Sequence, residues 1–328
     1  MMNTSLMLRF LLQSIVGCLL LFPSCKEKNE EYPPVVWNDF FFNAQHIAAR
    51  PVSAILNENN HSVWLGSQGG EGLLHFDGYS WKVFDYETTG IDFDSITCIT
   101  RDGNGLLWVG WKSGLAKYDG TSWTRIGQFN NRIVTSLSVA GLGSLWIGMK
   151  SGEFPGGLAY GLDNQWVFDP IPDFPSTEIN ALMLDFEQVL WIATQDLGII
   201  KVKNSTWKKA SEAIPLITQH GSALALSSDG SIWAAMLSQQ LVHFDKSGFT
   251  LFNTGTSVQV TGIFSAENGN IWCSTSGAGL LKFDGKNWTS FNMGNARLPS
   301  NDVLTLAKGD SGFLLFSLKN GQVLSIKQ

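Results

Sequence analysis

The chain has 328 residues, of which 44% are hydrophobic, and it contains 34 glycines and 13 tryptophans. This composition supplies enough apolar material for a large core and excludes a disordered chain. The formal net charge is −6 and no run of Lys or Arg occurs, which argues against nucleic acid as a partner.

Residues 10–22 form an apolar run of 13 residues after Arg9. Such a run is short for a membrane span and has the length of the apolar part of a signal peptide. Cys25 follows it, and then the charged run of residues 26–31. This change from apolar to polar sequence at one cysteine resembles a bacterial lipoprotein signal. The resemblance implies a lipid on Cys25 that anchors the protein at the bacterial outer membrane, on its periplasmic side or on the cell surface.

Two other interpretations of this segment stay open. Phe22 and Pro23 replace the aliphatic and small residues that usually precede a lipidated cysteine. Residues 15–18, which end in Cys18, fit that pattern better, but cleavage there would leave an apolar start. The second alternative is an ordinary secreted protein. With Cys25 as the lipidated residue, we expect a signal peptide over residues 1–24, a polar linker over 25–34 and a folded domain over 35–328.

From residue 52 onward, one pattern of short strands recurs seven times, with first strands that begin at residues 52, 96, 134, 179, 221, 260 and 303. Twelve residues after each start comes a large side chain: Trp64, Trp108, Trp146, Trp191, Trp233, Trp272 or Leu315. Two residues later comes a small one: Gly66, Gly110, Gly148, Ala193, Ala235, Ser274 or Ser317. Asp or Asn next to Gly between the strands predicts tight hairpin turns. Large and small residues in alternation are typical of tapered sheets that pack around an axis.

Each copy continues with a third strand, and fourth strands open on Trp81, Trp123, Trp166, Trp207, Phe249 and Trp288. The seventh copy has no such strand, but residues 35–41 carry Trp37 and Phe40 with the spacing of Trp81 and Phe84. We therefore predict an all-β fold, a seven-bladed β-propeller of four-stranded antiparallel blades over residues 35–328. An N-terminal strand should complete the last blade and close the ring. Six blades with a tail is the alternative.

The repeats resemble those of two-component-regulator propellers, whose signature is Asp-x-x-Gly-x-(Ile/Leu)-Trp-(Ile/Val)-Gly-Thr followed by Gly-Leu, an aromatic residue and Asp. Residues 102–120 and 267–285 come closest, and the resemblance spans residues 35–328. Propellers of that family usually form the periplasmic sensing half of histidine kinases, often for polysaccharides. This sequence shows no kinase module, so the resemblance implies only the ring and a sensing or binding role. A weaker resemblance exists to virginiamycin-type lyase propellers, whose catalytic His and Glu cannot be matched here.

No motif for a metal site, a phosphate loop or a catalytic nucleophile occurs, so we expect no catalytic residue, metal or cofactor. Cys98 and Cys273 lie in strands of different copies and are expected to be unpaired. His75 and His243 share a strand position with Lys117 and Lys282, which predicts that they face solvent.

The longer connections should all emerge on one face, where binding specificity tends to lie in repeat proteins. Candidate ligand-binding residues in those connections are Arg50, Trp111, Lys112, Arg132, Lys150, Gln195, His220, Gln239 and Arg297. Trp111 lies outside both structural tryptophan series. As an exposed ring it could stack on a sugar. The alternative is a side chain that caps the channel mouth.

A second candidate is a series of small polar residues near the channel: Ser53, Thr97, Thr135, Asn180, Ser222 and Thr261. These side chains either bind a ligand or hydrogen-bond local backbone, and the second role is the more common one for such residues.

The sequence therefore predicts a non-catalytic, lipid-anchored binding or sensing propeller, a monomer that recognises a glycan or an envelope protein. One alternative is an enzyme of lyase or hydrolase type that uses carboxylates of the same face: Asp94, Glu153, Asp173, Glu178 or Asp302. Another is a scaffold subunit of an envelope complex.

Overall fold

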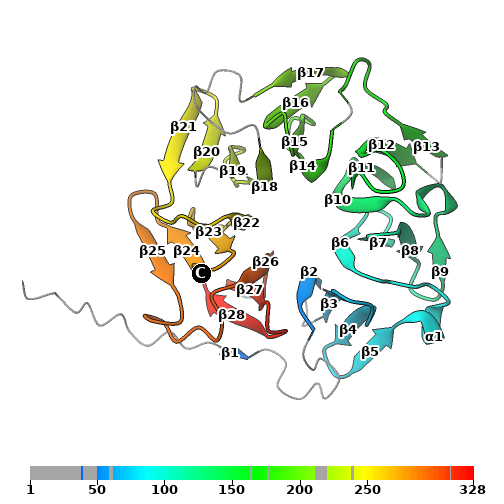
Figure 1. Ribbon diagram of the computed structural model, residues 1–328, viewed down its shortest axis with the longest axis horizontal. Coiled ribbons are helices and arrows are strands. Elements are labelled where there is room, and N and C mark those ends of the chain that lie inside the picture. Colours follow the sequence, from blue (N-terminus) through cyan, green and yellow to red (C-terminus); the bar gives the residue numbers. More distant parts are fainter. Residues whose placement is uncertain are drawn as a thin grey trace, which may run out of the picture. The chain divides into compact units, whose positions relative to one another are not determined.

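The computed structural model describes residues 38–39, 50–58, 62–162, 165–175, 177–210, 220–237, 240–310 and 312–328. The chain divides into two units, Met1–Pro34 and Val35–Gln328, and every element described belongs to the second. This unit contains seven antiparallel four-stranded sheets in a ring, so it is the seven-bladed β-propeller that the repeats predict (Figure 1).

The blades follow the order of the chain. Blade 1 contains β2 (Val52–Glu58), β3 (Ser62–Ser67), β4 (Leu73–Asp77) and β5 (Trp81–Phe84). Blade 2 contains β6 (Ile96–Arg101), β7 (Leu107–Trp111), β8 (Gly114–Tyr118) and β9 (Trp123–Arg125). Blade 3 contains β10 (Ile133–Val139), β11 (Ser144–Lys150), β12 (Gly157–Leu162) and β13 (Gln165–Phe168). Blade 4 contains β14 (Ile179–Leu184), β15 (Leu190–Thr194), β16 (Ile199–Lys203) and β17 (Thr206–Lys209).

The remaining blades repeat the arrangement. Blade 5 contains β18 (Gly221–Leu226), β19 (Ile232–Met236), β20 (Gln240–Asp245) and β21 (Gly248–Asn253). Blade 6 contains β22 (Val260–Ser265), β23 (Ile271–Thr275), β24 (Leu280–Phe283) and β25 (Trp288–Phe291). Blade 7 contains β26 (Val303–Lys308), β27 (Phe313–Leu318), β28 (Val323–Lys327) and β1 (Asn38–Asp39). Among the described residues, α1 (Tyr86–Thr89) and the 3-10 turn η1 (Gly127–Phe129) are the helical elements, and neither has the length and apolar character needed to cross a bilayer.

The ring closes through the N-terminal strand, as predicted. β1 lies antiparallel to β28, with Asn38 opposite Ser325 and Asp39 opposite Leu324 (Figure 1). Trp37 and Phe40, on which the prediction was based, lie outside the described residues. Pairing of the two ends of the unit protects the backbone edge of β28, which an open blade would expose.

Close contact between neighbouring blades explains the small residue on each second strand. A Cβ atom on Gly66 of blade 1 would lie 2.3 Å from Cγ2 of Ile96 in blade 2. The equivalent Cβ on Gly110 would lie 2.5 Å from Val134 of blade 3, and that on Gly148 would lie 2.6 Å from Ile179 of blade 4. These separations are far below van der Waals contact, so the first strand of the next blade occupies the space of the missing side chain.

The small polar residues of the first strands join the blades around the channel. Each sits at a register shift of its strand pair, for example between Val52 and Ala54 in blade 1. Thr97 and Thr135 donate to the carbonyls of Val134 and Ile179 in the next blade, both at 2.6 Å. Ser53, Asn180, Ser222 and Thr261 donate across blades in the same way. Their side chains therefore hydrogen-bond backbone, and that backbone belongs to the neighbouring blade rather than to their own strand.

Blade 7 carries Leu304 at this position, and Ser317 supplies the missing donor. Its Oγ donates to the carbonyl of Val52 in blade 1 at 2.7 Å. The contact between the last and first blades is therefore completed by a hydroxyl from a second strand.

Candidate functional site

We call the end of the propeller that carries the second-to-third-strand loops and the connections between blades the loop face. The opposite end, with the hairpin turns, is the turn face. On the loop face, the residue after each second strand is tied to the connection that precedes its own first strand. Lys112 N donates to Ser95 O at 3.2 Å, Gln195 N to Glu178 O at 2.9 Å, and Leu237 N to His220 O at 3.0 Å. The candidates Lys112 and Gln195 therefore occupy equivalent places on the loop face, and His220 lies beside the equivalent residue of blade 5, Leu237.

Lys150 of blade 3 and His220 of blade 5 are electrostatically coupled, although blade 4 separates their strands in the ring. Burial of His220, together with the nearby Lys150 ammonium, lowers the pKa of the imidazole below its usual value. Neither Lys112 nor Lys150 forms an ion pair within the described ranges. The Lys150 ammonium and a neutral His220 imidazole thus lie near each other at the mouth, and Lys112 is on the same face.

The remaining candidates do not join this group. Arg50 pairs with Glu71 at 2.8 Å and donates to Gly69 O at 2.8 Å, so it braces a loop of blade 1. The guanidinium of Arg132 lies over the rings of Phe154 and Phe168, at 4.5 and 4.3 Å from their centroids. Arg297 is exposed in the connection between blades 6 and 7. Gln239 lies outside the described residues.

The expectation that Trp111 is exposed is wrong. Its side chain has 0% exposed surface, its Nε1 donates to Ser113 Oγ at 3.0 Å, and its ring packs edge-on against Phe93 at 5.1 Å. Phe93 belongs to the connection between blades 1 and 2, which folds over the tryptophan. Ligand stacking and capping of the channel mouth both require surface that this ring lacks, so Trp111 is a core residue.

Two carboxylates of the enzyme alternative have partners of their own. Asp94 accepts hydrogen bonds from Ser95 N at 2.7 Å and Ser113 Oγ at 3.4 Å, and Asp302 lies 3.9 Å from Lys319 Nζ. Among the described residues, no three His, Cys, Asp or Glu side chains gather closely enough to hold a metal ion. Cys98 and Cys273 are free, as expected.

His75 and His243 do not simply face solvent, contrary to the prediction. The His75 ring stacks on Trp64 with centroids 3.9 Å apart, and the His243 ring lies 4.5 Å from that of Trp233. In blades 4 and 6, Lys201 and Lys282 place their ammonium groups over the corresponding tryptophans. The residue opposite the tryptophan on each third strand therefore covers the indole, which reduces its own exposure.

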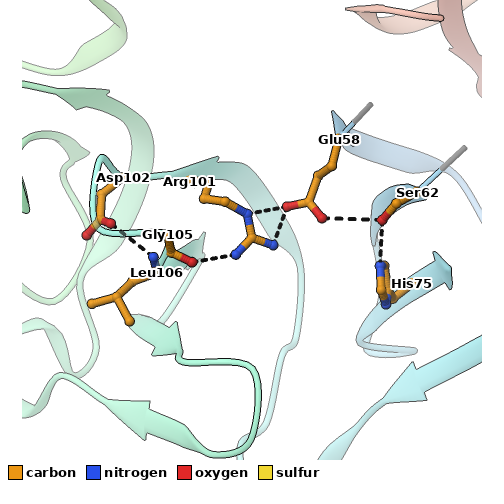
Figure 2. A network of polar contacts seen from close by, with 7 residues as sticks. All are labelled: Glu58, Ser62, His75, Arg101, Asp102, Gly105 and Leu106. Carbon is orange, nitrogen blue, oxygen red and sulfur yellow. Dashed lines mark hydrogen bonds and ion pairs between the residues drawn. The ribbon is translucent and has the colours of Figure 1, made fainter. Parts of the chain in front are cut away.

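A polar network on the turn face joins blades 1 and 2 (Figure 2). Ser62 Oγ lies 2.9 Å from His75 Nε2 and donates to Glu58 Oε2 at 3.3 Å, and Glu58 pairs with Arg101 of blade 2. This Ser–His contact does not form a catalytic triad, because Glu58 contacts the serine and not the imidazole. The network acts as a bridge between blades.

We expect stability to decline below about pH 6.5 in part through His75, since the unfolded imidazole takes up a proton near that pH. Burial is the main cause that lowers the pKa of folded His75, and the positive charges of Arg101 and Lys82 lower it further. The negative charges of Glu58 and Asp77 raise it and so oppose this shift. Between the two pKa values the folded state binds fewer protons than the unfolded chain, so its stability falls as pH falls. Above pH 6.5 the contribution is complete.

The variant His75→Tyr should reduce this pH dependence, because tyrosine does not titrate in that range. Tyr160 already packs on Trp146 at the same position of blade 3, with centroids 4.8 Å apart, so the ring fits. Urea unfolding midpoints at pH 7.5 and 5.5 measure the effect, and an unchanged difference between the two midpoints would contradict it.

Sequence reasoning missed a cavity of about 720 Å³ on the turn face between blades 4 and 5. Lys201, Trp191 and Phe186 line it from blade 4, and Asp229 and Asp245 line it from blade 5. No motif of the sequence marks this place, because the apolar Leu226 at the end of β18 has apolar equivalents, Val139 and Leu184, in blades 3 and 4.

Several solved structures share this fold. The extracellular domain of a putative hybrid two-component system of B. thetaiotaomicron matches with 17% identity and a TM-score of 0.72, over 88% of this chain and 39% of that chain. The chain thus spans about two-fifths of the length of that domain. A streptogramin B lyase matches with 13% identity and a TM-score of 0.74, over 89% of this chain and 97% of the lyase.

PorZ, described as a surface component of the type-IX secretion system of Porphyromonas gingivalis, matches with 16% identity and a TM-score of 0.66, over 85% of this chain and 46% of PorZ. No protein-family model and no curated protein matches the chain. At these identities the likeness shows the fold alone. The chain therefore has the propeller fold that it shares with extracellular domains of two-component regulators, in keeping with the resemblance of its repeats.

Proposed function

We propose that the protein is a non-catalytic binding or sensing propeller of the cell envelope that recognises a glycan or a protein partner through its loop face. A lipid on Cys25, which lies outside the described residues, would hold it at the outer membrane. The fold is one that extracellular regulator domains use, which supports an envelope role.

The observation that carries this proposal is the Lys150–His220 pair at the channel mouth, with Lys112 on the same face. Within the described ranges the two lysines have no carboxylate partner, and the His220 imidazole, whose pKa is lowered, remains a neutral donor or acceptor. Such a group can donate several hydrogen bonds to one ligand. It therefore favours a ligand rich in acceptors, such as an acidic glycan or an acidic protein surface.

The lyase or hydrolase alternative has weaker support. A likeness in fold to streptogramin B lyase says nothing of its chemistry in this chain. The Ser62–His75 contact is a nucleophile–base pair by distance, but it bridges blades 1 and 2 and is not among the residues that line the cavity described above. A scaffold role in an envelope complex is a form of protein binding that the same face could serve.

The test is a glycan array and an envelope pull-down with the whole chain in detergent. The double variant Lys112→Ala/Lys150→Ala should bind any captured ligand at least about tenfold more weakly, since a hydrogen bond to a charged group contributes about 1.5–3 kcal/mol. Lys286→Ala, an exposed turn-face lysine, is the matched control and should bind normally. Failure to capture any ligand, or equal binding by the double variant, would refute the proposal.

A further inference from the structure

The gap between blades 4 and 5 is apolar at the turn-face end of its first strand and contains a cavity. Blades 3, 4 and 5 carry Val139, Leu184 and Leu226 at equivalent positions there. In the other four gaps the sixth residue of a first strand makes a polar contact with the preceding blade. Asn57 donates to Asp310, Arg101 pairs with Glu58, Ser265 contacts Ser227 and Lys308 pairs with Glu267. Blade 5 carries Leu226 at this position, and Leu226 packs into the apolar cluster beside Trp191. No polar side chain from this position crosses to the turn of blade 4, and here the cavity opens.

Lys201 places its ammonium group inside this gap. Its Nζ lies 4.3 Å from the centroid of Trp191 and 5.5 Å from that of Phe244, so it faces rings from both blades. Desolvation by burial lowers the pKa of Lys201, and the charge of Asp185 opposes that shift. In the described part of the chain, Lys201 makes neither an ion pair nor a hydrogen bond to a protein acceptor. Its N–H groups are therefore free to donate to a ligand.

Two carboxylates face the same cavity with one oxygen each committed. Asp229 Oδ1 accepts from Ser231 N and Oγ at 2.9 and 2.6 Å. Asp245 Oδ1 accepts from the N and Oγ atoms of Ser247 at 2.7 and 2.6 Å. These bonds lower the pKa of both aspartates, so both are ionised at neutral pH. Asp229 Oδ2 can accept from a hydroxyl group, and so can Asp245 Oδ2, which lies 4.0 Å from His243 Nδ1, beyond hydrogen-bond distance.

An aromatic ring stands at the edge of the cavity. Phe186 lies in the turn between β14 and β15 and is 69% exposed, so its ring is accessible from solvent. Across the gap lies Gly230, where an added Cβ would be only 3.7 Å from Phe186 Cδ2. Gly230 therefore approaches one edge of the ring across the gap, without a side chain of its own.

We propose that this cavity is a second binding site, for a neutral oligosaccharide. Hydroxyl groups of the ligand accept from Lys201 and donate to Asp229 and Asp245, and one sugar ring stacks on Phe186. A polyol is both donor and acceptor, as these groups require, and its C–H face suits an aromatic ring. The volume of about 720 Å³ lies in the usual range for small-ligand sites. The cavity is lined by the carboxylates of Asp185, Glu187, Asp229 and Asp245 and by only two lysines, Lys201 and Lys246, which disfavours an anionic ligand.

This site does not depend on the loop-face proposal, because no loop-face candidate lines the cavity. The experiment titrates the whole chain in detergent with neutral di- to tetrasaccharides of glucose, galactose, mannose, xylose and arabinose, by calorimetry. Oligoglucuronate and tetralysine serve as charged probes. At least one neutral oligosaccharide should bind, and both Lys201→Met and Phe186→Ala should weaken it at least about tenfold.

Matched controls come from other blades. Lys282 covers Trp272 as Lys201 covers Trp191, and Leu142 is 76% exposed in the corresponding turn of blade 3. Lys282→Met and Leu142→Ala should therefore bind the sugar normally, and thermal unfolding shows that each variant is folded. No binding of any neutral probe, preference for a charged probe, or normal binding by both cavity variants would overturn the proposal. Loss of sugar binding in Lys112→Ala/Lys150→Ala alone would move the site to the loop face.

Discussion

Replacing Trp111 with alanine is expected to lower the free energy of unfolding by about 3–5 kcal/mol, the usual cost of truncating a buried aromatic residue. The indole has 0% exposed surface and packs against Phe93 of the connection between blades 1 and 2. A Cβ on Gly114 would lie 2.4 Å from its Cζ2 atom, which shows how closely the opposite strand approaches the ring. Alanine leaves a cavity that neither neighbour can fill, and Ser113 Oγ loses a donor.

Equilibrium urea unfolding measures this loss. The adjacent variant Lys112→Ala is the control, because its side chain is exposed and its strand position is outside the core. It should change stability by less than about 0.5 kcal/mol. A Trp111→Ala protein as stable as Lys112→Ala would show that the ring is not part of the core.

Substituting Gly66 with alanine is expected to destabilise the propeller by about 1–3 kcal/mol, although alanine suits a strand better than glycine does. The new methyl group would lie 2.3 Å from Cγ2 and 2.8 Å from Cβ of Ile96. Ile96 is only 1% exposed and is fixed in the first strand of blade 2, so it cannot move aside without shifting the strand. The substitution therefore pushes two blades apart.

A double-mutant cycle separates this clash from other effects. Ile96→Ala alone should lose about 2–5 kcal/mol, but Gly66→Ala should cost little in that background because the colliding atoms are gone. Gly127→Ala is the control, since an added Cβ there meets nothing within 4 Å. Strict additivity of the two losses would contradict the explanation.

Trp111 illustrates the limit of sequence reasoning. The sequence predicts Trp111 in the loop between the second and third strands and exposed, whereas it is the last residue of β7 and is buried. The corresponding residues of the sister blades include Met149, Met236 and Leu318, all at most 2% exposed, and their apolar character was a usable signal of burial. The covering residue, Phe93, comes from a connection whose path no repeat defines.

For the candidate site too, the sequence predicted the positions of residues but not the contacts of their side chains. Placement of Lys112 and Gln195 on the loop face followed from topology, because equivalent positions of a repeat occupy equivalent places in a ring. The coupling of Lys150 with His220 across blade 4, and the stacking of Arg132 on two phenylalanines, depend on side-chain direction. The cavity beside Leu226 is formed by side chains of two different blades, 4 and 5, and therefore could not be predicted from one repeat.

The sequence by itself determined the number of blades, the strand that closes the ring and the small residue on each second strand at the blade contacts. These features follow from local spacing repeated seven times, and a ring of identical units leaves little freedom in how they assemble. Only the tertiary structure decided that Trp111 is buried, that the channel hydroxyls join neighbouring blades and that the gap beside Lys201 is hollow. Each of these depends on atoms brought together from separate blades, and spacing within one repeat carries no information about those contacts.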